Sequence, residues 1–150
     1  MIQQGTPTLS QLYEADETAW LEAMAELIQQ GRLDDLDYLH LQEYLSDMAR
    51  RDRREVESRL ATLLTHLLKW TYQPDHRSRS WRGTLIEQRQ ELERHAASGV
   101  LRNHAEAVLT DCYAKAVVRA AAETGIAAES FPSACPHTLE QLLSPDFPAE

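Results

Sequence analysis

Residues 66–81 of this chain read HLLKWTYQPDHRSRSW, and this stretch decides the fold. The leucine-rich run that leads into it predicts a helix face turned toward a core. Pro74 ends that helix, because a proline pushes the residue before it, here Gln73, out of helical geometry. Ser78 or Ser80 can cap the next helix. The stretch therefore predicts two helices that meet at a tight corner.

The segment before this corner predicts an unusually long helix. From residue 39 to about residue 72 there is neither proline nor glycine, and the apolar residues keep one helical phase. Asp52, which lies among four arginines, is the one obvious fault in that stripe. We expect one long helix, or two helices with a bend near residues 49–53. A single helix would measure roughly 50 Å, longer than the core of a small domain, so part of it must bend, protrude or contact a second copy.

The N-terminal part predicts one helix before the long one. Thr8 and Gln11 have the spacing of a capping box at its start, and Gly31 stops it. Asp16 falls on the apolar stripe of this helix, as a polar group near the edge of the core. An aspartate is expected to cap the long helix that follows, and the candidates are Asp34, Asp35 and Asp37.

The C-terminal half predicts three more helices. One follows the corner and runs to about residue 97, a second runs from about residue 100 to a stop at Gly125, and Thr138 caps a short final one. No stretch shows the alternation of a strand. The pattern predicts an all-α fold. We expect a single-domain helical bundle of residues 1–150 with about five helices, a long central helix, an ordered body over about 8–125 and an irregular tail over 126–150.

The composition is typical of a cytoplasmic globular protein. Its 43% apolar and 26% charged residues are ordinary values for one domain of 150 residues. The N-terminus does not have the pattern of a secretory leader, and no segment approaches the roughly 18 unbroken apolar residues of a membrane span. Cys112 and Cys135 lack metal-binding spacing and are expected to be free thiols, with a disulfide as the less favoured alternative.

The net charge of −9 is unevenly distributed along the chain. Residues 1–49 hold ten acids against one arginine, residues 50–102 hold twelve bases against seven acids, and residues 103–150 hold two bases against seven acids. Either the acidic ends neutralise the basic middle within the fold, or the middle forms a patch for an anion such as RNA or a phosphate metabolite. The overall acidity argues against DNA binding.

Motifs spread over nearly the whole chain resemble a known family. They read Tyr13…Asp16…Trp20, Gly31-Arg32…Leu36-Asp37, Ser58-Arg59-Leu60…Leu63-Leu64…His66-Leu67-Leu68-Lys69-Trp70, Gln73-Pro74, Arg77-Ser78-x-Ser80-Trp81, Gln88-Arg89, Glu123-Thr124-Gly125 and Phe131-Pro132…Cys135-Pro136. In these motifs the chain resembles the DUF29 family of small bacterial proteins. The resemblance implies an α-helical fold and no activity, because the function of the family is unassigned. Where the family often has a Ser-Pro-Ser-Leu turn, this chain has a different loop at residues 97–101.

The corner is the first candidate site. Its aromatic and polar side chains are Lys69, Trp70, Tyr72, Gln73, Arg77, Arg79 and Trp81. Tryptophan, tyrosine and arginine are typical hot spots of protein interfaces. The same side chains could stack the bases and bind the phosphates of single-stranded RNA. In the structural alternative, the tryptophans lock the corner from inside and Arg77 pairs with N-terminal acids.

Arg59 and His66 form a second candidate pair. They lie seven residues apart, which places them on one face of the predicted helix within roughly 20°. This spacing resembles the Arg-x(4–6)-His motif of the all-α HEPN ribonucleases. There the histidine would move a proton to or from the 2′-oxygen or the leaving oxygen, while the guanidinium holds the phosphate. In the structural alternative, Arg59 pairs with a surface acid such as Glu55, and His66 flanks the core with its ring hydrogen-bonded.

A metal centre is the third candidate, and we do not favour it. Glu43, Asp47, His66 and His104 lie on different predicted helices, but the Glu-x-x-His spacing of di-iron bundles is absent. We therefore expect neither a metal nor another cofactor. The sequence favours a non-enzymatic module that binds a protein partner or a second copy of itself, with a homodimer through the long helix as one form. The alternative is a HEPN-like ribonuclease or RNA-binding toxin-type module that uses Arg59 and His66.

Overall fold

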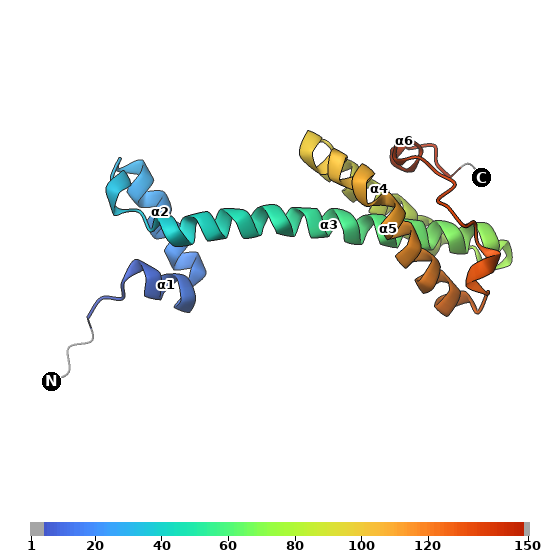
Figure 1. The fold of residues 1–150 in the computed structure, drawn as a ribbon, viewed down its shortest axis with the longest axis horizontal. Coiled ribbons are helices and arrows are strands. Elements are labelled where there is room, and N and C mark those ends of the chain that lie inside the picture. Colours follow the sequence, from blue (N-terminus) through green and yellow to red (C-terminus); the bar gives the residue numbers. More distant parts are fainter. Residues whose placement is uncertain (1–4, 149–150) are drawn as a thin grey trace. The chain divides into compact units, whose positions relative to one another are not determined.

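The computed structural model of the protein describes residues 5–148 as helices and short connections (Figure 1). The α-helices of this part of the chain are α1 (Leu9–Ala15), α2 (Glu17–Gln29), α3 (Tyr38–Tyr72), α4 (Arg79–Ala96), α5 (Gly99–Thr124) and α6 (Leu139–Leu143). Three short 3₁₀-helices join them: η1 (Leu33–Asp35), η2 (Pro74–His76) and η3 (Ala128–Ser130). Residues 5–148 contain no strand. The prediction of an all-α fold with a long central helix is therefore confirmed.

The predicted first helix is wrong in one respect, because the structure divides it at Asp16 into α1 and α2. Asp16 has φ −153° and ψ 86°, and its carboxylate accepts a hydrogen bond from the Ala19 backbone N–H at 3.1 Å. A short acid competes well for free backbone N–H groups, so aspartate favours a cap over a helix interior. The capping box of Thr8 and Gln11 and the stop at Gly31, where φ is 71°, are as predicted.

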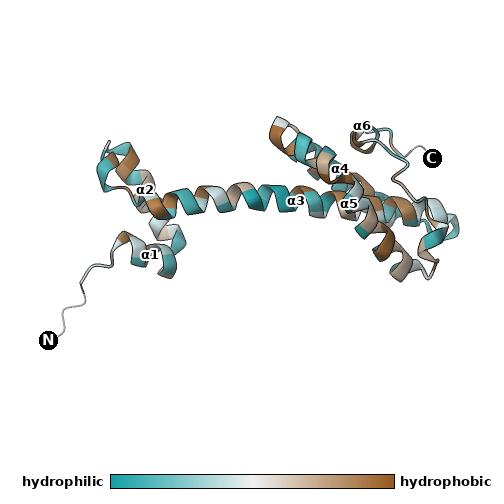
Figure 2. Cartoon of the chain, viewed as in Figure 1, coloured by the Kyte–Doolittle hydropathy of each residue, from teal (hydrophilic) through white to brown (hydrophobic). Residues whose placement is uncertain are grey.

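The long segment forms a single helix, the first of the two expected alternatives. Asp37 caps α3, and its carboxylate accepts a hydrogen bond from the His40 backbone N–H at 3.4 Å. Contacts divide the chain into two compact units, Met1–Arg50 and Arg51–Glu150, and α3 contributes to both. Figure 2 shows the hydrophilic middle of α3, where the arginine-rich segment lies. One domain over all 150 residues stays a prediction.

The N-terminal unit is held together by aromatic rings more than by an apolar core. Within its described residues, only Trp20 and Met24 are buried. The Trp20 ring meets the edge of Tyr13 at 4.8 Å and lies 5.8 Å from Tyr44. Tyr13 also stacks on His40 at 4.3 Å. These rings fix α1 and α2 against the first turns of α3.

Asp37 gives this aromatic cluster its polar centre. The indole N–H of Trp20 donates to Oδ2 of Asp37 at 3.2 Å, and Nδ1 of His40 lies 2.8 Å from the same oxygen. Burial would raise the pKa of Asp37, but the hydrogen bonds from His40 and Trp20 outweigh it and hold that pKa below its usual value. The charged carboxylate is therefore part of the packing of this unit.

The C-terminal unit has a continuous apolar core. It comprises Val56, Leu60, Ala61, Leu63, Leu64, Leu67 and Leu68 of α3, Leu85 and Leu92 of α4, Ala105, Cys112, Tyr113, Ala116 and Ala120 of α5, Phe131, and Leu139 and Leu142 of α6. Most of the leucines come from α3 and most of the small side chains from α5, so α5 can pack closely against α3. Among the described residues no helix is long and apolar enough to cross a membrane.

The segment after α5 is irregular apart from η3 and α6, as predicted, and it packs against the core. It begins at Gly125, whose φ of 76° stops α5 as predicted. Phe131 is only 4% exposed, and the Tyr113 hydroxyl donates a hydrogen bond to the Pro132 carbonyl at 2.6 Å. Thr138 caps α6 through the predicted capping box. The tail therefore closes one side of the core.

Candidate functional site

The corner between α3 and α4 is built by residues 73–78 of the C-terminal unit. Gln73 leaves helical geometry at φ −130° and ψ 64°, as the following proline requires. The chain then makes the short η2 turn, and the Ser78 hydroxyl accepts a hydrogen bond from the Trp81 backbone N–H at 3.2 Å. Local sequence signals thus place the end of one helix beside the start of the next.

Arg77 joins both sides of the corner. Its guanidinium carbon lies 4.8 Å from the centre of the Trp70 ring, and its Nε donates to the Trp70 carbonyl at 2.8 Å. That carbonyl belongs to the last turn of α3, where the helix itself supplies no partner. The Nε–H of Arg77 therefore supplies the hydrogen bond that this carbonyl lacks within the helix, and the Arg77 side chain remains exposed to solvent. Arg77 thus makes its contact with Trp70 inside the corner, and the structural alternative of pairing with N-terminal acids stays a prediction.

Lys69 makes the second cation–aromatic pair of the corner. Its Nζ lies 4.8 Å from the centre of the Trp81 ring and 3.2 Å from Oε2 of Glu123. The Lys69 side chain is only 15% exposed, whereas that of Glu123 is 43% exposed. Lys69 thus ties the end of α3 to both α4 and α5. The positive charge of Lys69 is therefore engaged within the protein, by the Glu123 carboxylate and the Trp81 ring.

The other predicted residues of the corner spread over its outer side. Tyr72 is 37% exposed, and its ring meets the edge of Phe131 at 5.1 Å. Gln73 is half-buried, and Arg79 is exposed at the first residue of α4. The structure therefore gathers Lys69, Trp70, Arg77 and Trp81, with Tyr72, Gln73 and Arg79 around them; whether this surface binds a partner stays a prediction.

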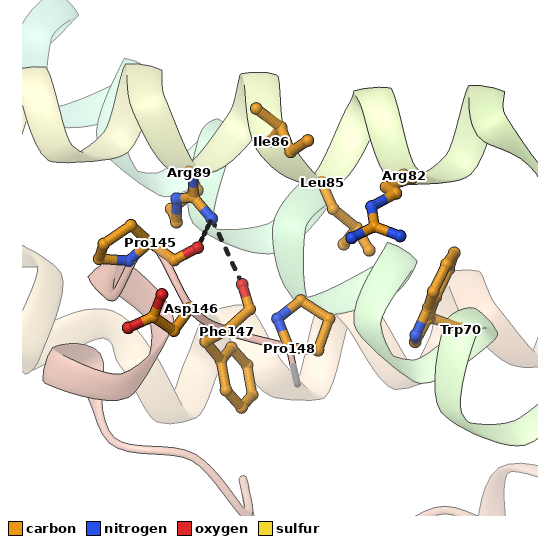
Figure 3. A pocket seen from close by; sticks show the side chains of 9 residues that line it. All are labelled: Trp70, Arg82, Leu85, Ile86, Arg89, Pro145, Asp146, Phe147 and Pro148. Atoms are coloured by element: carbon orange, nitrogen blue, oxygen red, sulfur yellow. Dashed lines mark hydrogen bonds between the residues drawn. The ribbon is translucent and has the colours of Figure 1, made fainter. Parts of the chain in front are cut away.

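A pocket of about 310 Å³ adjoins Trp70 (Figure 3). It is lined by Trp70 of α3, by Arg82, Leu85, Ile86 and Arg89 of α4, and by Pro145, Asp146, Phe147 and Pro148. The Arg89 guanidinium donates through Nη1 to the carbonyls of Pro145 at 3.0 Å and Phe147 at 3.4 Å. This arginine holds the C-terminal segment beside α4, and the space between them combines apolar walls with charged groups of both signs.

The α4 side of this pocket was not predicted from the sequence. A signal exists, because Arg82, Leu85, Ile86 and Arg89 have the i, i+3, i+4, i+7 spacing of one helix face. The opposite wall comes from residues 145–148, and the hydrogen bond that joins the two spans 56 positions of sequence. Helical spacing carries no information on such a distant contact.

Arg59 and His66 make the contacts of the structural alternative. The Arg59 Nε donates to Oε1 of Glu55 at 2.8 Å, and Nη1 donates to Oε1 of Gln88 at 3.4 Å. Nδ1 of His66 lies 3.0 Å from the Thr62 carbonyl, one turn earlier in α3. Two turns of helix separate the pair by about 10 Å along its axis. A catalytic role for them stays a prediction.

The predicted metal-ligand candidates belong to different units. Glu43 and Asp47 lie in the N-terminal unit, and His66 and His104 in the C-terminal one. Nε2 of His104 lies 3.1 Å from Oε1 of Glu57. Within residues 5–148, no three histidine, cysteine, aspartate or glutamate side chains are placed to hold one ion.

Neither cysteine has the environment of a nucleophile. Cys112 and Cys135 are free thiols, and burial raises the pKa of each above the usual value. The thiolate is the reactive form, so a raised pKa disfavours reaction at neutral pH. Burial lowers the pKa of the neighbouring His137, which is therefore mostly neutral and gives no positive charge to stabilise a thiolate.

Comparison with protein families identifies the family of this chain. The family model "Domain of unknown function DUF29" matches residues 12–148, which cover both compact units. No curated protein and no solved structure matches the chain.

Proposed function

Because the chain belongs to the DUF29 family, whose function is unknown, we propose from its geometry that it is a non-enzymatic, cytoplasmic protein-interaction module. Its working surface is the helix corner together with the adjoining pocket. One observation is the main support for this proposal: the exposed Arg77 guanidinium lies over the Trp70 ring, and the same ring lines the pocket. A rigid aromatic ring beside an arginine and a concave apolar wall is typical of interface hot spots.

The chemistry of this surface favours a peptide segment of a protein partner. A volume of about 310 Å³ is at the lower end for ligand sites, and it suits one or two side chains more than a large cofactor. Leu85 and Ile86 offer apolar contact, while the guanidinium of Arg77 offers paired donors to a carboxylate. We infer a partner that presents an apolar side chain close to an acidic one.

Two matched substitutions test this proposal. Ile86 lines the pocket and is 40% exposed, whereas Val118 lies on α5, is 68% exposed and is not among the residues that line the pocket. The full-length protein and its Ile86→Glu and Val118→Glu variants are used to capture proteins from cell extract, and the retained proteins are quantified by mass spectrometry. Circular dichroism confirms that both variants are folded.

The proposal predicts that Ile86→Glu loses a specific set of proteins that Val118→Glu retains. Equal retention by both folded variants contradicts it. Retention of RNA in place of protein favours the alternative of an RNA-binding module. The ribonuclease form of that alternative has less support, because the Arg59 guanidinium is already bound by Glu55.

A further inference from the structure

The first turns of α3 carry an apolar stripe that the N-terminal unit covers only in part, and the Tyr38 hydroxyl at its start donates to the Leu33 carbonyl at 2.6 Å. Tyr38 is 57% and Leu45 60% exposed, and Leu41 and Met48 are half-buried. These residues follow one another at spacings of three, four and three. At about 100° per residue they fall within an arc of about 80° on the helix. This is the a/d spacing of a coiled-coil seam.

The rest of this unit already uses a different face of α3. His40 and Tyr44 contact the rings of Tyr13 and Trp20, so α1 and α2 cover that side. The unit has about 50 residues, and scaffolds of that size often gain stability from oligomerisation because a single small core supplies little. The seam is therefore a face of α3 on which apolar surface remains exposed in a regular helical register.

We propose that this seam pairs with the same seam of a second copy of the chain in antiparallel orientation. Tyr38 of one copy then lies opposite Met48 of the other, and Leu41 lies opposite Leu45. Leucine against leucine in one layer and tyrosine against the flexible methionine in the other can fill the space between the two helices. The next position of the seam is Asp52, and this acid limits the apolar pairing to residues 38–48.

The charges on either side of the seam favour a second copy as the occupant and fix its direction. The exposed acids Asp34 and Asp35 precede the seam, and the arginines Arg50, Arg51, Arg53 and Arg54 follow it. An antiparallel pair brings the acids of each copy near the arginines of the other, whereas a parallel pair brings like charges together. Asp35 and Arg50 keep their local partners Arg32 and Asp47, at 2.9 Å and 2.8 Å. The attraction between copies is therefore mainly long-range.

The mass of the full-length protein tests the pairing. We expect sedimentation equilibrium to give a mass that rises from monomer to dimer between low micromolar and roughly millimolar concentration. Leu45→Glu should keep the protein monomeric over that range. The matched control is Leu39→Glu, because Leu39 is 73% exposed on the same helix but lies about 120° away from Leu45. This variant should dimerise like the parent.

Three results would overturn the pairing: a parent protein that stays monomeric at every concentration, a Leu45→Glu variant that still dimerises, or equal loss of dimer in both variants. Circular dichroism shows whether each variant keeps its helices. These residues lie outside the corner and its pocket, so failure here leaves the proposed function intact, and the reverse also holds.

Cysteine cross-linking tests the direction. Tyr38→Cys and Met48→Cys proteins are oxidised separately and as a mixture, and the linked peptides are identified by mass spectrometry, which separates them from any link through Cys112 or Cys135. An antiparallel pair yields the 38–48 link in the mixture and no link within either single variant. Links of residue 38 to residue 38, or of 48 to 48, would contradict the antiparallel arrangement, as would a mixture without the 38–48 link.

Discussion

The two compact units of this protein reach stability in different ways. The C-terminal unit encloses a continuous apolar cluster drawn from α3, α4, α5 and α6, whereas the described part of the N-terminal unit buries only Trp20 and Met24 and relies on rings around Asp37. The C-terminal unit buries its apolar cluster within one chain. The N-terminal unit leaves Tyr38 and Leu45 more than half exposed on its longest helix. On the proposed pairing, the N-terminal unit gains from association the apolar contacts that the C-terminal unit makes within one chain.

Trp20→Ala should have the largest effect on the N-terminal unit. The change removes the centre of the aromatic cluster and the donor to Asp37, at a cost of about 3–5 kcal/mol. A unit with so few buried side chains should then lose its structure. Hydrogen exchange should show lost protection over residues 9–48, with residues 56–142 unchanged. Equal loss of protection in both units would contradict the comparison.

Leu60→Ala should have the next largest effect, this time on the C-terminal unit. Leu60 is fully buried, and a leucine-to-alanine change at such a site costs about 2–5 kcal/mol. Denaturant unfolding followed by circular dichroism measures the loss. Val118→Ala is the control, and it should change stability by less than about 0.5 kcal/mol, because Val118 is 68% exposed. A Leu60→Ala effect as small as that of the control would show that the cluster does not hold this unit.

Asp37→Asn should have a moderate effect that depends on pH. The amide can still cap α3, but it loses the charge that accepts hydrogen bonds from Trp20 and His40, so we expect a loss of about 1 kcal/mol at neutral pH. The folded pKa of Asp37 lies below the unfolded value of about 3.9. Its contribution is therefore present above that value and is lost as the pH falls through the folded pKa.

Urea unfolding at a series of pH values measures this dependence. The free-energy difference between parent and variant should shrink as the pH falls below about 4. A difference that stays constant from neutral to acid pH would show that the Asp37 charge does not stabilise the unit.

The smallest effect is expected for His66→Ala, which should leave RNA cleavage unchanged. The Arg59 guanidinium is bound by Glu55, and Nδ1 of His66 lies against the Thr62 carbonyl, so we expect no cleavage of total RNA by the parent or by the variant. Gel analysis after prolonged incubation measures it. Cleavage by the parent that disappears in the variant would instead establish the ribonuclease alternative.

The sequence predicted the features that depend on neighbouring residues. Pro74, Ser78 and Gly125 act on the backbone within a few positions, and their helix boundaries are found where expected. The contact of Arg59 with Glu55 is likewise one helical turn long, and it was one of the expected alternatives.

Other features depend on competition or on distant residues, so the sequence could not decide them. Asp16 fits a helix stripe by spacing, but its carboxylate forms a better contact with the free backbone N–H of Ala19 and divides the helix. The pocket beside Trp70 exists because Arg89 binds carbonyls near the C-terminus. Arg77 lies on Trp70 because the corner brings together residues seven positions apart.

Hydrogen exchange of the native full-length protein at low and high concentration tests the central comparison most directly. We expect strong protection of residues 56–68 at both concentrations. Residues 38–48 should be weakly protected at low concentration and clearly more protected at high concentration. Equal protection of the two segments, unchanged by concentration, would contradict this comparison.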